Sequence, residues 1–432
     1  MWTALSFGTF ADNTLRQALL IGIPAGIITT PFFTDADNAL PFIGALLPLA
    51  ILIFSSVSGQ LADKYETAFM FRRTKFAELL LMLTAAIAFA SGIGWLAIAM
   101  LFAMGAQSAF FSPVRVGAMP KYLKPNELVR GNGLCNAGLF TFILLGYMAG
   151  GALIVQEGGG FMVGAVLISA ASIGFLAALR TPKAAANAPD LKLSFNGVTQ
   201  TVRMFKFVFE GRGVAPPLLG VGVFYLLSTA VTVIIPLYGR DALYAEPLVW
   251  AALNGLFAIG AGIGAVTAAS LPKAKSSLGA STLAIACAGV ASFLVYCLTP
   301  LAAGSEANPV SLASFFSSAS GLSLTFILIL TAALAGVYIA PLQAAMQRRA
   351  APAVRARIMA ASAFANAAFA IPGSLSLLAI TATGVDPRLA FIAVGVAMLI
   401  IAGIMFARMR ALPEGLYDEM LSSADESPLQ ND

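Results

Sequence analysis

Four polar residues lie together in the first long apolar segment of the chain, where charged groups are costly. Asp12 and Arg16 are one helical turn apart. Asn13 and Gln17 repeat this spacing directly beside them. Ionisable residues inside a membrane span usually pair with one another or face a water-filled cavity. The carboxylate could therefore bind a proton or a cation and the guanidinium a phosphate, while an ion pair that only makes Arg16 tolerable is the structural alternative.

Further polar side chains extend this candidate binding surface into later segments. Arg115 follows Pro113 and could hold a phosphodiester through two parallel hydrogen bonds, or it could anchor the end of a helix at the membrane surface. For each amide, hydrogen bonding between neighbouring helices is the alternative explanation. We take Asp12 as the candidate coupling residue. The candidate substrate-binding residues are Asn13, Arg16, Arg115, Asn132, Asn136, Gln343 and Asn366.

The composition excludes a water-soluble globular protein and several kinds of catalytic site. The 432 residues are 59% hydrophobic and only 10% charged, whereas soluble domains are about 25% charged. The chain has no histidine, which excludes histidine-dependent triads and histidine-bound metals. Its three cysteines lie in apolar stretches and indicate neither a disulfide framework nor a metal site. We therefore predict a protein that is not an enzyme and has no cofactor or metal.

The apolar segments that position these residues predict an all-α membrane protein with twelve crossings. One crossing takes roughly 20 apolar residues, so the chain is long enough for twelve crossings and their loops. We expect membrane helices near 4–27, 40–62, 76–93, 95–113, 132–155, 159–180, 214–239, 247–271, 279–299, 321–345, 357–380 and 388–408.

The basic residues separate by the side on which each connection lies. All but three of the 25 Lys and Arg residues fall in the even-numbered connections or at the C-terminal end. Arg16 is inside a helix, and Arg240 and Arg388 lie in odd-numbered connections. The positive-inside rule then places both termini in the cytoplasm. Spread over many loops, these charges form no nucleic-acid patch. Lys75 precedes the predicted third helix, and we expect Glu78 to pair with it at the membrane interface.

A weak internal repeat divides the chain into two halves. Pro113 is followed by a basic loop, and Pro341 is followed by Arg348 and Arg349 in the second half. Such repeats are typical of transporters built from two six-helix halves, although chance similarity between alanine-rich helices is the alternative. The predicted parts are a six-helix bundle at 1–180, a cytoplasmic linker with an amphipathic helix at 181–213, a second bundle at 214–408 and an acidic tail at 409–432.

Glycines gather on two of the predicted helices. They occur in the fifth helix at Gly146, Gly150 and Gly151, and in the eighth at Gly260 and Gly264. Glycine removes the side chain where two helix backbones approach closely, although it is also common in membrane helices generally. We expect these runs to mark close helix packing.

One loop resembles a signature of the major facilitator superfamily. Between the second and third predicted helices the chain reads Gly59-Gln-Leu-Ala-Asp63-Lys, followed by Arg72 and Arg73. This resembles the G-x-L-A-D-R motif, in which an acidic residue faces basic groups at a helix end and forms a latch that breaks when the two halves rock. The resemblance implies a major facilitator fold with two pseudo-symmetric six-helix bundles. Gly59, Asp63, Arg72 and Arg73 become gating candidates, with either arginine able to close the latch.

Five stretches, one of which contains this loop, resemble a narrower family. They are Phe7–Asn13, Ser58–Tyr65, Phe111–Gly117, Glu127–Gly133 and Ile143–Gly151. Together they look like the bacterial lysophospholipid transporters, including versions fused to acyltransferase and acyl-ACP synthetase modules. The resemblance implies a monomeric protein of the bacterial cytoplasmic (inner) membrane that moves lysophospholipid inward for reacylation by such a partner enzyme. The family often has Lys-Tyr-Gly at 115–117 and glutamate at 136, so this chain is expected to prefer a different head group.

Two other functions stay open on the sequence. One is a multidrug or small-metabolite porter of the same fold. The other is a membrane scaffold for an acyltransferase that transports nothing itself. A gene neighbour or fusion partner encoding an acyltransferase would favour the lysophospholipid transporter over the porter.

Overall fold

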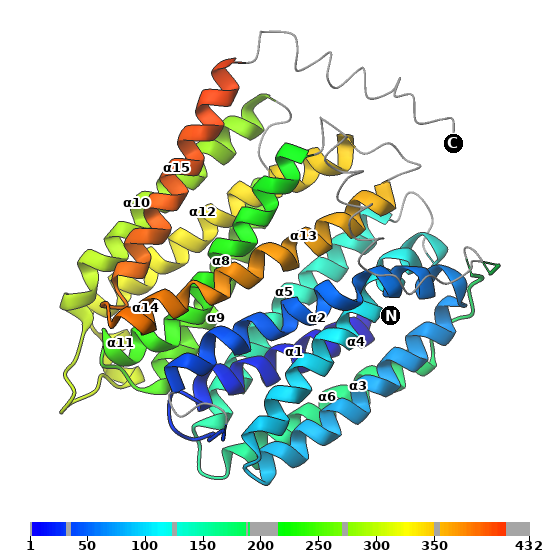
Figure 1. The fold of residues 1–432 in the computed structure, drawn as a ribbon, viewed down its shortest axis with the longest axis horizontal. Helices are drawn as coiled ribbons and strands as arrows, with labels where there is room; N and C mark the ends of the chain where they lie inside the picture. The colour runs from blue at the N-terminus through cyan, green and yellow to red at the C-terminus, as the bar shows by residue number, and fades with distance from the viewer. Residues whose placement is uncertain are drawn as a thin grey trace.

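The regular structure of this protein consists of long helices (Figure 1). The computed structural model describes residues 2–31, 36–122, 128–186, 189–190, 215–269, 275–349 and 355–411. Twelve of the helices in these ranges have 21 residues or more. They are α1 (Trp2–Gly22), α2 (Ala36–Lys64), α3 (Thr67–Ala90), α4 (Gly94–Tyr122), α5 (Leu128–Ile154), α6 (Gly159–Leu179), α8 (Ala215–Asp241), α9 (Pro247–Ala269), α10 (Lys275–Ala302), α12 (Ala319–Arg349), α13 (Arg355–Leu375) and α15 (Leu389–Ala411), with the short helices α11 (Leu312–Ser317) and α14 (Leu377–Thr383).

Most of these helices have the length and apolar composition of membrane spans. Eight described helices meet both conditions, from α4 to α15, and α2 meets them if its two bent arms count as one span. α1, α3 and α5 are absent from this group, and α1 and α3 carry charges in their middle, at Asp12, Arg16, Lys75 and Glu78. The protein is therefore an all-α, multi-pass membrane protein.

The helices form two bundles. In the first, α1 packs on α5 and α6, α3 packs on α4 and α6, and α2 packs on α4. In the second, α12 packs on α9 and α10, α8 on α13, and α15 on α10. The bundles meet along α2 with α13 and along α5 with α9. In Figure 1 the helices coloured blue to teal form one body and those coloured green to red the other, with α2 and α13 running side by side.

Glycines allow the closest helix contacts, as their runs in the sequence predicted. A Cβ atom added at Gly146 of α5 would lie 2.6 Å from the Phe10 carbonyl oxygen of α1. In the second bundle, a Cβ at Gly260 of α9 would lie 2.5 Å from the Ile329 carbonyl oxygen of α12. Gly264, one turn later, would clash with the backbone of the same helix. The predicted close packing is confirmed for both helices.

The bundles touch at the end where α1 finishes and α2 begins. The Ser374 hydroxyl of α13 donates a hydrogen bond of 2.7 Å to the Pro41 carbonyl oxygen of α2. A side chain on Gly44 would collide with Ser374, and one on Gly151 of α5 would collide with Ala251 of α9. Small residues therefore bring the two bundles together on both lines of contact.

Helix α3 differs from its sequence prediction in a way that matters for function. It begins at Thr67 rather than near residue 76, so Lys75 and Glu78 both lie inside the helix. The expected pair of Lys75 and Glu78 is confirmed, but its interfacial placement is wrong, because each residue is only 1% exposed. The two charges neutralise each other, which lets the helix continue where a hydropathy window ends it.

Two other sequence predictions need comment. The predicted helix at 357–380 is interrupted at Ser376, between α13 and α14. The amphipathic linker helix and the acidic tail lie outside the described residues, apart from the first residues after α6 and the end of α15.

The contact at Gly264 gives a stability prediction. We expect Gly264→Ala to lower the free energy of unfolding by about 1–3 kcal/mol, because the added methyl group meets backbone atoms that cannot move aside cheaply. The gain in helix propensity, about 1 kcal/mol, does not offset this. Thermal unfolding of the detergent-solubilised protein measures the change. Gly403→Ala in α15 is the matched control, since a Cβ there meets nothing within 4 Å. Equal melting temperatures for the two variants would contradict the close packing of α9 on α12.

Candidate functional site

A polar cavity lies inside the first bundle, between α1, α2, α3 and α4. Its volume is about 190 Å³, which is enough for several water molecules. Asp12 lines it, and the Ser108 hydroxyl of α4 donates a hydrogen bond of 3.0 Å to Asp12 Oδ2. Asp12 Oδ1 is buried and has no hydrogen-bond partner. Arg115 lines the same cavity from α4.

A buried ion pair on α3 also lines the cavity. Lys75 Nζ lies 2.7 Å from Glu78 Oε2, and the side chains are 1% and 2% exposed. Gln107 Nε2 of α4 donates a 3.0 Å hydrogen bond to the same Glu78 oxygen. The Lys75 ammonium also lies 4.6 Å from the centre of the Phe111 ring. Glu78 Oε1 is buried without a partner. The burial of these residues beside Asp12 was not predicted from the sequence. The spacing of Lys75 and Glu78 was visible, but their burial depends on contacts with other helices.

Asp12 and Arg16 do not pair, although they are one turn apart on α1. The Arg16 guanidinium turns toward α5, where Nη1 donates a 3.3 Å hydrogen bond to the Tyr147 hydroxyl. Arg16 Nε is buried without a partner. In the part of the chain that the structure describes, no ion pair within 4.0 Å joins Arg16 to Asp12. The alternative in which the pair only neutralises itself is therefore not seen.

The two amides beside them also face α5. Asn13 Nδ2 donates a hydrogen bond of 2.7 Å to the Thr9 carbonyl oxygen of its own helix. Gln17 is fully buried, and neither of its amide atoms has a hydrogen-bond partner. A Cβ on Gly151 would lie 3.7 Å from Gln17 Cγ, next to the contact between α5 and α9. The strip on α1 therefore divides, with Asp12 facing the cavity and the other three residues facing α5.

The remaining substrate-binding candidates are spread over three helices. Asn366 on α13 is partly buried, and its Oδ1 has no hydrogen-bond partner. Gln343 on α12 is partly exposed. Asn132 and Asn136 lie on α5, but their side chains fall outside the described part. Neither Gln343 nor Asn366 is among the described residues that line the polar cavity.

The gating candidates sit at the ends of α2 and α3. Gly59 has open space where a Cβ would be, and Asp63 is exposed. Arg72 points to the end of α6, where its Nη2 donates a 3.2 Å hydrogen bond to the Thr181 carbonyl oxygen. The Arg73 guanidinium lies 5.3 Å from the centre of the Phe69 ring. The two arginines thus have different partners on this end of the bundle.

The chain that leaves α6 is fixed to the same end. The Thr67 amide donates to the Ala184 carbonyl oxygen at 3.1 Å. Lys121 Nζ donates to the Ala185 carbonyl oxygen at 2.7 Å, and the Tyr122 hydroxyl to the Pro182 carbonyl oxygen at 2.8 Å. Burial and the nearby Glu66 carboxylate raise the pKa of the Tyr122 phenol, so it keeps its donor proton. The start of the connection between the bundles is therefore bound to α3 and α4.

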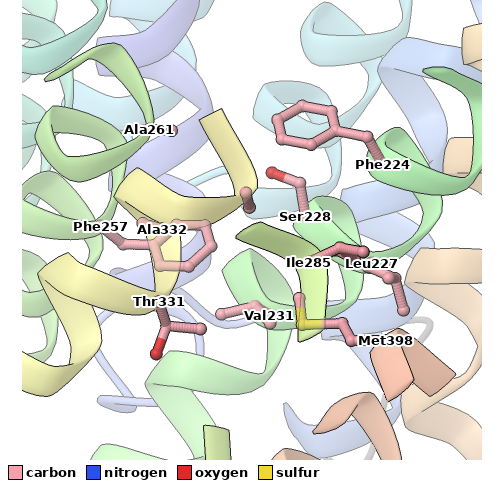
Figure 2. A pocket seen from close by; sticks show the side chains of 11 residues that line it. Phe224, Leu227, Ser228, Val231, Phe257, Ala261, Ile285, Thr331, Ala332 and Met398 are labelled. Carbon is pink, nitrogen blue, oxygen red and sulfur yellow. The ribbon is translucent and has the colours of Figure 1, made fainter. Parts of the chain in front are cut away.

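The second bundle encloses a different kind of space. A cavity of about 10 Å³ lies between α8, α9, α10, α12 and α15 (Figure 2). Phe224, Phe257 and Met398 line it, and Figure 2 shows oxygen atoms only on Ser228 and Thr331. The Thr331 hydroxyl donates to the Ile327 carbonyl oxygen of its own helix. The cavity is apolar, unlike that of the first bundle.

Comparison with known proteins identifies the fold. Over 94% of this chain the structure matches a POT family transporter in complex with 5-aminolevulinic acid, with 12% identity, 95% of that chain covered and a TM-score of 0.68. It also matches the nucleoside transporter NupG, with 13% identity, 98% coverage of that chain and a TM-score of 0.65. The chain has the major facilitator fold. The predicted all-α architecture and its major facilitator fold are therefore confirmed.

Comparison of the sequence alone finds similarity to a narrower group of transporters. The lysophospholipid transporter LplT of Salmonella heidelberg is 26% identical over 264 residues, and that of Salmonella arizonae is 27% identical over the same length. The match spans 61% of this chain and 62% of the Salmonella heidelberg protein. No family model matches the chain. The similarity agrees with the resemblance seen in the motifs and supports a membrane transporter.

The cavity can be tested by thiol labelling in a variant whose three native cysteines are replaced by serine. We expect Ser112→Cys, which lines the cavity, to react with a membrane-impermeant thiol reagent. Ser292→Cys should react at least about tenfold more slowly, because Ser292 is fully buried and only an accessible thiolate reacts. Labelling rates followed by mass spectrometry measure the difference. Labelling of Ser112→Cys as slow as that of Ser292→Cys would show that water does not reach the cavity.

Proposed function

We propose that this protein is a secondary transporter that moves lysophospholipid, of the lysophosphatidylethanolamine type, from the outer to the inner leaflet of the bacterial cytoplasmic membrane by alternating access. One observation supports this most: the charges inside the helices belong to one bundle. Asp12, Arg16, Lys75, Glu78 and Arg115 all lie in the first bundle, whereas the helices of the second bundle carry charges only at their ends. An amphiphile needs this division between a charged and an apolar wall.

The side chains suggest how the head group is held. Arg16 and Arg115 would contact the phosphate, because a guanidinium can make two parallel hydrogen bonds to it. Asn13, Asn132, Asn136, Gln343 and Asn366 would bind the remaining polar atoms. Asp12 would couple transport to a proton or another cation, since its Oδ1 is buried, unpartnered and beside a cavity.

The distribution of charge supports an orientation with both termini in the cytoplasm. The two arginines of the odd-numbered connections are each matched by an adjacent aspartate. Arg240 Nη2 lies 2.8 Å from Asp241 Oδ2. Hydrogen bonds from Arg388 hold the pKa of the Asp386 carboxyl below its ordinary value, so this pair stays ionised. The proposed outer side thus carries few unbalanced positive charges, in agreement with the positive-inside rule.

The rest of the proposal follows from the fold and the relatives. The two bundles would rock about their contacts along α2 with α13 and α5 with α9. A latch of Gly59, Asp63, Arg72 and Arg73 would hold one end. The product needs an acyl group at its free hydroxyl, so an acyltransferase or acyl-ACP synthetase system in the cytoplasm is the expected consumer. One chain contains both bundles and would work as a monomer.

Uptake of labelled lysophosphatidylethanolamine into sealed vesicles tests the function. We expect Arg16→Ala to raise the half-saturating concentration about tenfold or more, because one charged hydrogen-bond partner of the phosphate is lost. Arg180→Ala, at the exposed end of α6, is the matched control and should leave uptake unchanged.

The coupling role has its own variant. Asp12→Asn should abolish the dependence of uptake on pH and on sodium while Asp190→Asn, an exposed residue, should not. Normal transport by Asp12→Asn with unchanged pH and sodium dependence would remove Asp12 from the mechanism.

Two outcomes would favour the other functions. Efflux of a cationic dye, with no uptake of any lysolipid, would make the protein a multidrug or small-metabolite porter. The folds of the peptide and nucleoside transporters are compatible with that reading. Loss of membrane remodelling in cells, with no measurable flux in vesicles, would make it a scaffold.

A further inference from the structure

The charges around the polar cavity are balanced in number and opposite in sign. Among the described residues that line it, Asp12 and Glu78 are acidic and Lys75 and Arg115 are basic. We propose that this cavity selects a zwitterionic head group whose ammonium carries N–H, with Asp12 Oδ1 accepting a hydrogen bond from the ammonium while Arg115 holds the phosphate. The inference rests on the proposed function for the class of cargo and adds the group by which the cargo is selected.

The Asp12 carboxylate has one oxygen in use and one to spare. The Ser108 hydroxyl donates a hydrogen bond of 3.0 Å to Oδ2, while Oδ1 is buried and has no partner. An ionised carboxylate oxygen only accepts hydrogen bonds, and a buried acceptor without a donor is costly. The group that satisfies Oδ1 must therefore be a donor, and a charged N–H donor makes the stronger bond.

Glu78 is already matched within the protein. Its Oε2 accepts hydrogen bonds from Lys75 Nζ at 2.7 Å and from Gln107 Nε2 at 3.0 Å. The carboxylate and the ammonium of this pair are 2% and 1% exposed, so the pair is closed off from solvent. Asp12 is therefore the carboxylate with which a bound cation would interact.

The balance of charge favours a zwitterion over an anion. A head group that carries only a phosphate would add a negative charge to a cavity wall that has no net charge. Uncompensated charge in a buried site is costly. Once a phosphate engages Arg115, the charge on Asp12 needs a different cation. An ammonium on the same head group supplies that cation, so a zwitterion leaves both sides compensated.

The register of α4 places the two ends of the site on one helix face. Ser108, Ser112 and Arg115 follow the i, i+4, i+7 spacing, and all three line the cavity. Ser108 marks the level of Asp12, and Arg115 is about 10 Å further along the helix axis. The long arginine side chain can span part of that separation. Ethanolamine phosphate, with its ammonium and phosphate at the ends of a short chain, can reach both groups.

A choline head group lacks a suitable partner in this cavity. A trimethylammonium group has no N–H, and proteins bind it against the faces of aromatic rings. Phe111 is the one aromatic side chain among the described residues that line the cavity, and the Lys75 ammonium lies 4.6 Å from its ring centre. Choline would therefore leave Asp12 Oδ1 unpaired. Sites with a buried hydrogen-bonding group reject an analogue that leaves this group unpaired.

The same oxygen is the one proposed for the coupling cation. An ammonium and a coupling ion cannot both occupy Asp12 Oδ1, so they would bind there in turn. The ion would hold the oxygen in the empty cavity, and the head group would replace it. Cargo and ion would then be linked through one carboxylate.

A series of N-methylated lysolipids tests the proposal on the unmodified full-length protein. Each compound, with the same acyl chain, competes with radiolabelled lysophosphatidylethanolamine for the purified protein. We expect the monomethyl and dimethyl compounds to bind within about threefold of the parent, because an N–H remains. The trimethyl compound, lysophosphatidylcholine, should bind about tenfold or more weakly. Lysophosphatidylglycerol, which has no ammonium, should bind about tenfold or more weakly as well.

Asp12→Asn assigns the preference to its residue. This variant should bind lysophosphatidylcholine as the unmodified protein does, which also shows that it is folded. Its preference for the ethanolamine compound over the choline compound should fall to about one, because the charged acceptor is lost. Asp386→Asn, outside the first bundle, is the matched control and should keep the full preference.

Three results would overturn the inference. One is equal binding of the ethanolamine and choline compounds by the unmodified protein. Another is an even loss of affinity with each added methyl group, which would indicate a limit on size rather than a need for N–H. The third is a preference that Asp12→Asn retains.

Failure of the proposed function would look different. Selective binding without uptake into vesicles would reject transport and leave the head-group site standing. If no lysolipid binds at all, the proposed cargo is wrong, and head-group fragments then test the site by themselves. Aminoethyl phosphate should slow the thiol labelling of Ser112→Cys, whereas phosphocholine should not. Equal effects of the two fragments would reject the site.

Discussion

The packing of the first bundle is constrained by the free-energy cost of burying charged side chains. Removing one partner of a buried ion pair typically costs 3–5 kcal/mol, at about the level of a whole protein's margin of stability. Lys75 and Glu78 meet this cost by pairing, and Gln107 adds a hydrogen bond to the same oxygen. Among the described residues, the Ser108 hydroxyl is the hydrogen-bond partner of Asp12. Polar contacts therefore join α4 to α3 through Gln107 and α4 to α1 through Ser108.

Hydropathy was sufficient to predict most of the fold. Helices with apolar centres, such as α9 and α15, were located within a few residues, because their signal is local. The start of α3 was not located this closely. A hydropathy window counts Arg72, Arg73 and Lys75 as loop charges, because the neutralisation of Lys75 by Glu78 is not part of the local signal. The same limit hid the cavity wall. Gln107 and Ser108 are ordinary polar residues in the sequence, and only the packing of α4 brings them to Glu78 and Asp12.

The two bundles have the same architecture and different chemistry. α4 and α12 contain the repeated proline, yet the first bundle surrounds a polar space and the second an apolar one. A soluble cargo would need polar groups from both sides to replace its hydration shell. An amphiphile requires them from one side only, and its chain can use the other. The two bundles therefore differ in the charge of their interior, since ionisable residues inside the described helices belong to the first bundle.

The contact between α2 and α13 determines how the bundles part at that end. Among the described residues, one side-chain hydrogen bond, from Ser374 to the Pro41 carbonyl, joins them there, and such a bond contributes about 0.5–1.5 kcal/mol net. The rest is the fit of small residues around Gly44. Separation there breaks dispersion contacts rather than ionic ones. Its rate would thus follow temperature and the lateral pressure of the bilayer, and would be nearly insensitive to ionic strength.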